Sequence, residues 1–174
     1  MQPFDFNLFR QQVKEATQNA LIEATRQYTG EVCAFALYSD EGVLTLSPAV
    51  NTLSYLQKQQ AEDPDNTEYY QWSPAEWKNE GNLATEDFNQ LSALLRNTVL
   101  GKTYTESFPR FRENVFETVL SVLEEMRKEN WFQNMILVFT LTDYDNPRQE
   151  SNWIKRLNDS VHSENFRLWR HSWG

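Results

Sequence analysis

The feature that most restricts the fold is a run of seven residues, Met135 to Leu141, which reads MILVFTL. It is the longest apolar run in the chain, and it is apolar on both alternating faces. This length and pattern predict an interior β-strand that is covered on each side. The run is far shorter than the roughly 18 or more apolar residues that a membrane-spanning helix needs.

Helical periodicity precedes and follows this strand. From Phe6 to the helix-stopping Gly30, apolar residues recur at spacings of three and four, which is typical of an amphipathic helix. Similar stripes, or residues suited to cap a helix, occur further along. Thr85 suits the N-cap of the third helix. The expected helices cover residues 6–29, 51–60, 85–100 and 109–126, with a shorter one around 153–157, and the tail from 166 to 173 fits a helix or a strand.

Two β-rich runs, 31–39 and 43–50, flank the turn-prone Asp40-Glu41-Gly42 and predict a hairpin. Pro48 lacks a backbone donor, which places the end of its strand at a sheet edge or in a bulge. These elements predict an α+β fold with a mostly antiparallel sheet, a buried central strand and several helices packed against it. We expect a single domain over residues 1–174, with 159–174 as a candidate C-terminal extension.

The composition predicts a cytoplasmic protein. The N-terminal residues include Asp5 and other polar side chains where a secretory signal would be apolar. The single cysteine, Cys33, excludes an internal disulfide and any multi-cysteine zinc site.

The motifs of several large enzyme classes are absent from the sequence. The five glycines never lie closer than twelve residues apart, so neither a dinucleotide fingerprint nor a phosphate-binding loop can be formed. His162 and His171 are the only histidines, and no G-x-S-x-G motif occurs. Cys33 lies among apolar residues, which favours a small buried side chain over an activated thiolate. We therefore expect no catalytic residue, no metal site and no cofactor.

Acidic residues concentrate in one segment of a chain whose net charge is −9. Eight acids and one base, Lys78, lie between positions 62 and 87, among them Asp63, Asp65 and Glu68. This balance argues against binding to nucleic acid or to an anionic membrane. The segment is either a solvated acidic face or a docking surface for a basic protein partner.

The most distinctive local pattern is Trp72-Ser73-Pro74-Ala75-Glu76-Trp77. Ser73 suits a helix N-cap, and Glu76 stands where its side chain can reach back to the cap. Trp72 and Trp77 then occupy the two positions of a hydrophobic staple. The pattern therefore predicts a helix starting at Pro74, and the two tryptophans are also candidate binding residues.

Asp143 and Asp145 follow the buried strand and are candidates for binding a cation or for general-acid chemistry. The calcium-loop register fails, because Arg148 stands where glycine is needed and Ile154 where glutamate is needed. The alternative is a turn that ends the strand. In the tail, Trp169 and Trp173 either dock the tail onto the body or present aromatic anchors to a partner.

Several of these features together resemble an uncharacterised bacterial family, the domain of unknown function 4303. The resemblance runs from about Phe9 to about Asn158, and it rests chiefly on Trp72, Glu76, Trp77, Asn51, Thr52 and Asp143. It implies a soluble bacterial α+β domain and brings no established activity, cofactor or catalytic residue.

Two hypotheses of function follow. The first is a non-catalytic binding protein whose acidic segment contacts a basic partner, for example an immunity protein that neutralises a toxin. The second is an enzyme acting on a sugar or nucleotide, with Glu76, Asp143 and Asp145 in a pocket walled by Trp72 and Trp77.

Overall fold

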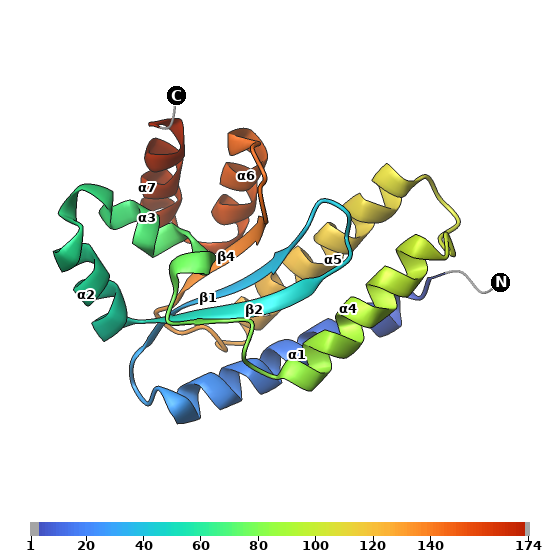
Figure 1. Ribbon diagram of the computed structural model, residues 1–174, viewed down its shortest axis with the longest axis horizontal. Coiled ribbons are helices and arrows are strands. Elements are labelled where there is room, and N and C mark those ends of the chain that lie inside the picture. The colour runs from blue at the N-terminus through green and yellow to red at the C-terminus, as the bar shows by residue number, and fades with distance from the viewer. Residues whose placement is uncertain (1–3, 173–174) are drawn as a thin grey trace.

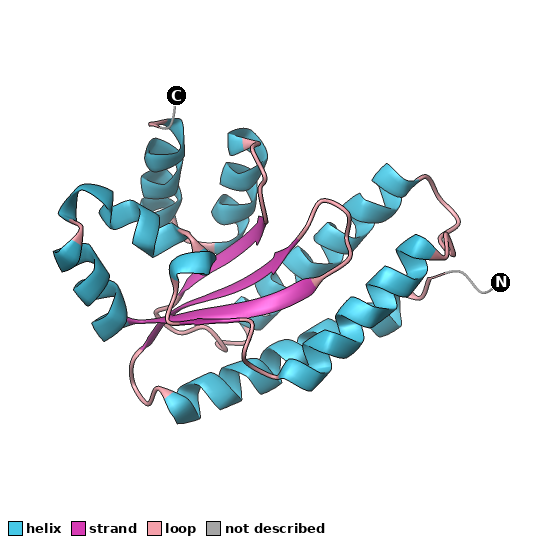
Figure 2. Cartoon of the chain, in the orientation of Figure 1, coloured by secondary structure: helices cyan, strands magenta, loops and turns pink. Residues whose placement is uncertain are grey.

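The computed structural model describes residues 4–172 of the chain. A four-stranded sheet forms the middle layer, and helices lie over both of its faces (Figure 1). Helices make up most of the chain, and the strands run through its centre (Figure 2). The expected α+β class is confirmed. In chain order the elements are α1 (Phe6–Gln27), β1 (Val32–Ser39), β2 (Leu46–Thr52), α2 (Leu53–Glu62), η1 (Pro64–Asn66), α3 (Thr67–Trp72), η2 (Pro74–Glu76), β3 (Asn79–Glu80), α4 (Thr85–Leu100), α5 (Phe108–Lys128), β4 (Ile136–Leu141), α6 (Pro147–Leu157) and α7 (Ser160–His171).

The strand order in the sheet is β3-β2-β1-β4. Strands β1 and β2 form the expected antiparallel hairpin, and β2 pairs antiparallel with the short β3. Strand β4 joins β1 in parallel. The sheet is therefore mixed, with two antiparallel pairings and one parallel pairing.

The prediction that residues 135–141 form an interior strand was wrong in one respect. Strand β4 is covered on both faces, since Leu137, Val138 and Phe139 are all buried, but it lies at the edge of the sheet. An apolar pattern reports the covering of faces and carries no information on strand neighbours. At this edge the side-chain amide of Asn158 pairs with one strand residue: it accepts a hydrogen bond from Leu137 N at 2.9 Å and donates one to Leu137 O at 2.7 Å.

The two faces of the sheet carry side chains of different size. One face presents large residues such as Phe35, Leu37 and Phe139 to the long helices α1, α4 and α5. The other face presents small ones, including Ala36 and Ala49, to the shorter helices. Because side chains alternate along each strand, the same strands build a thick core on one side and a shallow layer on the other.

Local sequence signals set some helix starts and fail at others. Thr52 caps α2 as expected, by accepting from Tyr55 N. Thr85 does not cap α4, because Ala84 takes the cap position in a left-handed conformation and Thr85 is the first helical residue. The tail, which fitted either a helix or a strand, is helical in α7.

No α-helix begins at Pro74, so the predicted staple was wrong. Trp72 ends α3, and residues 74–76 form one 3-10 turn that the Ser73 side chain does not cap. At Trp77 the backbone is extended and leads into β3, which pairs with Ala49 and Val50 of β2. Pairing with the sheet therefore overrides the helix-start signal at this point.

Within residues 4–172, none of the helices combines the length and the apolar character that crossing a membrane requires.

Candidate ligand pocket

A pocket of about 340 Å³ lies on the shallow face, where β1 and β4 end. The two strands are parallel, so their carboxyl ends meet at one edge, with Tyr38 of β1 beside Thr140 of β4. Such an edge is where open sheets with parallel strands commonly bind ligands, because side chains from several loops converge there. The pocket is large enough for a small molecule.

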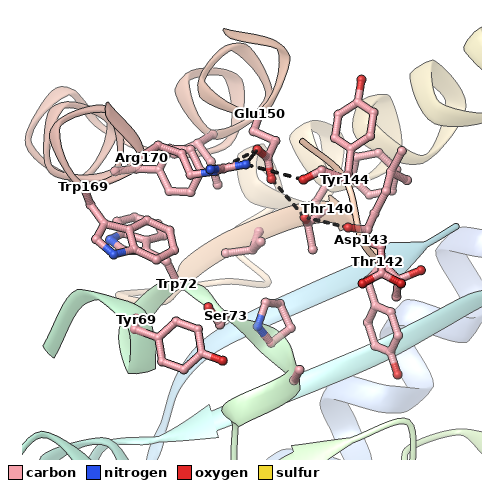
Figure 3. Close-up of a pocket in the computed structure, with 18 of the residues that line it drawn as sticks. Tyr69, Trp72, Ser73, Thr140, Thr142, Asp143, Tyr144, Glu150, Trp169 and Arg170 are labelled. Atoms are coloured by element: carbon pink, nitrogen blue, oxygen red, sulfur yellow. Dashed lines mark hydrogen bonds and ion pairs between the residues drawn. The ribbon is translucent and has the colours of Figure 1, made fainter. Parts of the chain in front are cut away.

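Aromatic side chains from α3 and α7 form one wall of the pocket. Tyr69 and Trp72 come from α3, and Phe166 and Trp169 come from α7. The ring of Phe166 lies 5.2 Å from that of Trp72 and 5.7 Å from that of Trp169, centroid to centroid. Tyr69 is held by its hydroxyl, which donates to Glu76 at 2.9 Å. The wall is thus a packed cluster of rings (Figure 3).

A buried ion pair closes the pocket next to this wall. Glu150 of α6 and Arg170 of α7 are 7% and 6% exposed. Oε2 of Glu150 accepts from Nε of Arg170 at 2.9 Å and lies 2.7 Å from its Nη2. Burial raises the pKa of Glu150, while the guanidinium acts in the opposite direction. The pair joins α6 to α7 and places both charges in the lining.

The loop after β4 forms the side facing the aromatic wall (Figure 3). Asp143 has a left-handed backbone, with φ 55°, a conformation that aspartate tolerates better than most residues. Tyr144 stacks on Trp153 of α6 at 5.6 Å, and Asn146 caps α6 by accepting from Gln149 N. The loop is therefore anchored at its far end, and Asp143 remains exposed at the pocket.

At the end of the pocket toward β3, Tyr38 lies beside Glu80. Burial and the nearby Glu80 carboxylate raise the pKa of Tyr38 to about 12. Tyr38 is therefore a neutral hydroxyl at physiological pH, and it contributes a ring and a polar atom to the lining.

The structure brings only some of the predicted site residues together. Trp72 and Asp143 line the pocket, whereas Trp77 is buried away from it. Glu76 does not line the pocket, but it accepts a hydrogen bond from the hydroxyl of Tyr69, which does. Asp145 has a side chain that is 90% exposed and reaches Arg170 from outside, at 3.4 Å. The pocket predicted from the sequence, with three carboxylates and two tryptophans, is therefore not the one that forms.

The acidic residues between positions 62 and 87 do not lie together in the structure. Asp63 lies between α2 and η1, Asp65 on η1 and Glu68 on α3, and of these Asp65 and Glu68 are exposed. Asp63 is engaged, because it accepts from Asn66 and from the Tyr70 hydroxyl at 3.0 Å. Asp87, at the start of α4, accepts from Asn19 of α1 on the other side of the sheet. The eight acids therefore do not share one face.

Sequence reasoning missed Glu150 and Arg170, although a signal was present. Glu150 precedes Trp153, Ile154 and Leu157 at spacings of three, four and seven, and all four are buried on one face of α6. Arg170 follows Phe166 by four residues, and these two are the buried residues of α7. A charged residue on an apolar helical stripe must find a buried partner. Trp169 lies in the wall, and Trp173 falls outside the described residues.

Residues 4–172 contain no cluster of His, Cys, Asp and Glu side chains that could hold a metal ion. Cys33 is half-buried in β1, and burial raises the pKa of its thiol to about 11. A thiol of this kind is protonated and unreactive at neutral pH.

The fold and the site define a class of protein: an α+β domain with a mixed sheet and a pocket at the ends of its two parallel strands. Within this class, the family model for the domain of unknown function DUF4303 matches residues 13–159. The chain belongs to this family, and the resemblance expected from its motifs is confirmed. No curated protein and no solved structure matches the chain. Helix α7, which supplies Phe166, Trp169 and Arg170 to the pocket, follows the matched region.

Proposed function

We propose that the protein is a non-catalytic binding protein and that the pocket between α3, β4, α6 and α7 is its ligand site. The observation that carries this proposal is the combination of a packed aromatic wall with a buried ion pair, Glu150 with Arg170, in one cavity. Large apolar pockets with a few placed polar groups are the usual form of a small-molecule site. Burying two charges is costly, and a role in ligand binding would account for their retention there.

A ligand screen by thermal shift tests this proposal, with divalent metals, nucleotides, sugars and organic amines as the compounds. A ligand at one hundred times its dissociation constant stabilises the folded state by about 2.7 kcal/mol, which raises Tm by roughly 5–11 °C for a chain of this size. A blocked variant, Ala75→Trp, places bulk at an exposed position of the lining. The matched control, Ala61→Trp, changes an exposed alanine at the end of α2, outside the pocket.

The expected result is a shift in the wild type and in Ala61→Trp, and a much smaller one in Ala75→Trp. A shift that survives unchanged in Ala75→Trp would assign the ligand to another surface. No shift from any compound would count against the pocket as a small-molecule site.

A protein partner is the second candidate function, and the exposed acids on η1 and α3 favour it. Asp65 and Glu68 lie on the segment that also supplies Tyr69 and Trp72 to the pocket wall, so a basic protein docked there would sit beside the pocket. A toxin neutralised by an immunity protein is one such partner. Its association should slow strongly with salt.

Charge reversal separates this idea from the first. The variant Asp65→Lys with Glu68→Lys leaves the engaged Asp63 intact. Capture of a partner co-expressed from adjacent genes should weaken, whereas the same reversal at the exposed Glu15 and Glu113 on the opposite helices should not matter. Equal capture by both variants would remove the acidic segment from the interface.

Catalysis on a sugar or nucleotide is the remaining alternative. The raised pKa of Glu150 is a property of general acids, and it is the feature that favours an enzyme. Against it, Glu150 is held by two nitrogens of Arg170, Nε and Nη2, and Glu76 and Asp145 do not line the pocket. Turnover of a bound ligand that stops in Glu150→Gln while binding persists would favour an enzyme over a non-catalytic binding protein.

A further inference from the structure

The charged groups in the pocket lining are unequal in sign. Three carboxylates, Glu80, Asp143 and Glu150, face one guanidinium, Arg170, which leaves the lining with a net charge of −2. Arg170 and Glu150 form a close pair and largely cancel. The net charge therefore resides on Glu80 and Asp143.

Arg170 is poorly placed to receive an anion. Its Nε and Nη2 are directed at Glu150, and Nη2 also lies 3.4 Å from both the Tyr144 carbonyl and the Asp145 carboxylate. A phosphate or carboxylate ligand would have to displace these contacts and approach Glu150 and Asp143 as well. Like charges in a partly dehydrated cavity repel strongly.

Glu80 and Asp143 take part in no ion pair with any base in the described part of the chain. Glu80 has Tyr38 as its neighbour, and the Tyr38 hydroxyl is neutral. Asp143 is exposed at the end of β4. Both carboxylates are thus available to neutralise a positive charge.

Aromatic rings in the pocket lining also favour a positively charged ligand. The rings of Tyr38, Tyr69 and Trp169 all line the cavity. A cation over the face of such a ring is attracted by its quadrupole, and the attraction grows when water is excluded. The Tyr69 hydroxyl donates to Glu76, and this contact fixes the position of its ring.

We propose that the pocket binds an organic cation, a ligand with an ammonium or guanidinium group that contacts the aromatic wall and is neutralised by Glu80 and Asp143. This inference rests on the proposed function of the pocket. It excludes nucleotides and sugar phosphates, which are anionic. The cationic group belongs either to a free amine or to the basic side chain of a protein partner.

Isosteric pairs that differ only in charge test the proposal. Choline and its neutral analogue 3,3-dimethylbutan-1-ol have the same shape, as do methylguanidine and methylurea. Calorimetric titration of the wild-type protein should show each cation bound at least tenfold more tightly than its neutral partner. Acetyl-Gly-Arg-Gly-amide separates the two sources, because a site for a partner's side chain binds this peptide better than methylguanidine. Glucose and AMP represent a neutral sugar and a nucleotide.

Two variants remove charge without changing shape. Asp143→Asn keeps a residue that tolerates the left-handed backbone, and Glu80→Gln changes an exposed position on β3. Each should weaken cation binding roughly three- to tenfold, as expected for the loss of one nearby charge in a partly hydrated site. Asp65→Asn, an exposed acid outside the lining, is the matched control and should leave binding unchanged.

The outcomes separate the two proposals. Equal or tighter binding of the neutral analogues, glucose or AMP would overturn the cation assignment and leave the pocket as a ligand site. Cation binding that Asp143→Asn and Glu80→Gln do not alter would also overturn it. Failure of every compound to bind would count against the pocket itself.

Discussion

Replacing Arg170 with methionine should destabilise the protein strongly at pH 7 and far less at pH 5. The side chains of Arg170 and Glu150 are 6% and 10% exposed, and Glu150 is held by two nitrogens of Arg170. Methionine keeps a flexible unbranched stem of comparable packing, so the change removes mainly the charge and the donors. Glu150 is then a buried carboxylate without its cation, a change that typically costs about 3–5 kcal/mol.

The cost has an upper limit, because Glu150 can take up a proton instead of staying charged. Protonating a carboxyl with the ordinary pKa of 4.5 costs about 3.4 kcal/mol at pH 7 and about 0.7 kcal/mol at pH 5, at roughly 1.36 kcal/mol per pH unit. The expected loss in the free energy of unfolding is therefore about 3 kcal/mol at pH 7 and under about 1 kcal/mol at pH 5.

The direction of this pH dependence follows from the numbers of protons that the folded and unfolded chains bind. Burial already raises the pKa of Glu150 in the native protein, and removing Arg170 raises it further. The folded chain then binds more protons than the unfolded chain. The stability contributed by this group is fully present below the unfolded pKa of 4.5, and it is lost as the pH rises through the folded value.

Urea unfolding followed by far-UV circular dichroism at both pH values measures this effect. Arg167→Met is the matched control, because Arg167 lies in the same helix but forms an exposed pair with Glu164. It should leave the free energy of unfolding nearly unchanged at both pH values. The double variant Glu150→Met with Arg170→Met should recover most of the loss at pH 7. A loss in Arg170→Met that is the same at pH 5 and pH 7 would refute the reasoning.

Three further predictions concern the rest of the structure. Asn158→Ala should lower the free energy of unfolding by about 1–3 kcal/mol, because it leaves the backbone groups of Leu137 at the β4 edge unsatisfied. Urea unfolding measures this loss, and a loss under about 0.5 kcal/mol would mean that water replaces the amide. Arg156→Gln should lower the free energy of unfolding by at most about 1 kcal/mol, and by nothing in 1 M salt, because its bidentate pairs with Glu117 and Glu124 are partly exposed. A salt-independent loss would contradict this. Cys33, with a pKa of about 11, should react with an aromatic disulfide at pH 8 far more slowly than free cysteine, and a comparable rate would show that the strand opens.

Much of the helical architecture could be predicted from the sequence. The apolar spacing from Phe6 onward predicted α1, and Thr52 marked the start of α2, because both signals act over a few neighbouring residues. The hairpin of β1 and β2 was equally local. Helical periodicity is determined within one or two turns of chain, so the sequence alone specifies it. Capping was predicted correctly at Thr52 and wrongly at Thr85.

Local signals failed where distant parts of the chain compete for the same residues. Ser73 and Pro74 have the composition of a helix start, but the chain from Trp77 pairs with β2 and stays extended. Likewise the apolar run at β4 indicated burial on two faces and could not say which strands lie beside it.

The residues of the pocket carry local sequence signals, whereas their pairing depends on the tertiary structure. The sequence holds Glu150 and Arg170 at helical spacing from apolar residues, but it left the tail open to a helix or a strand and singled out neither charge. It did mark Trp72 and Asp143 as parts of distinctive local patterns. Only the packing of α7 beside both α6 and α3 decided that Glu150 pairs with Arg170, that Trp72 joins their pocket and that Trp77 does not. The physical reason is that burial fixes a need for a partner, whereas the identity of that partner depends on which helices the sheet brings together.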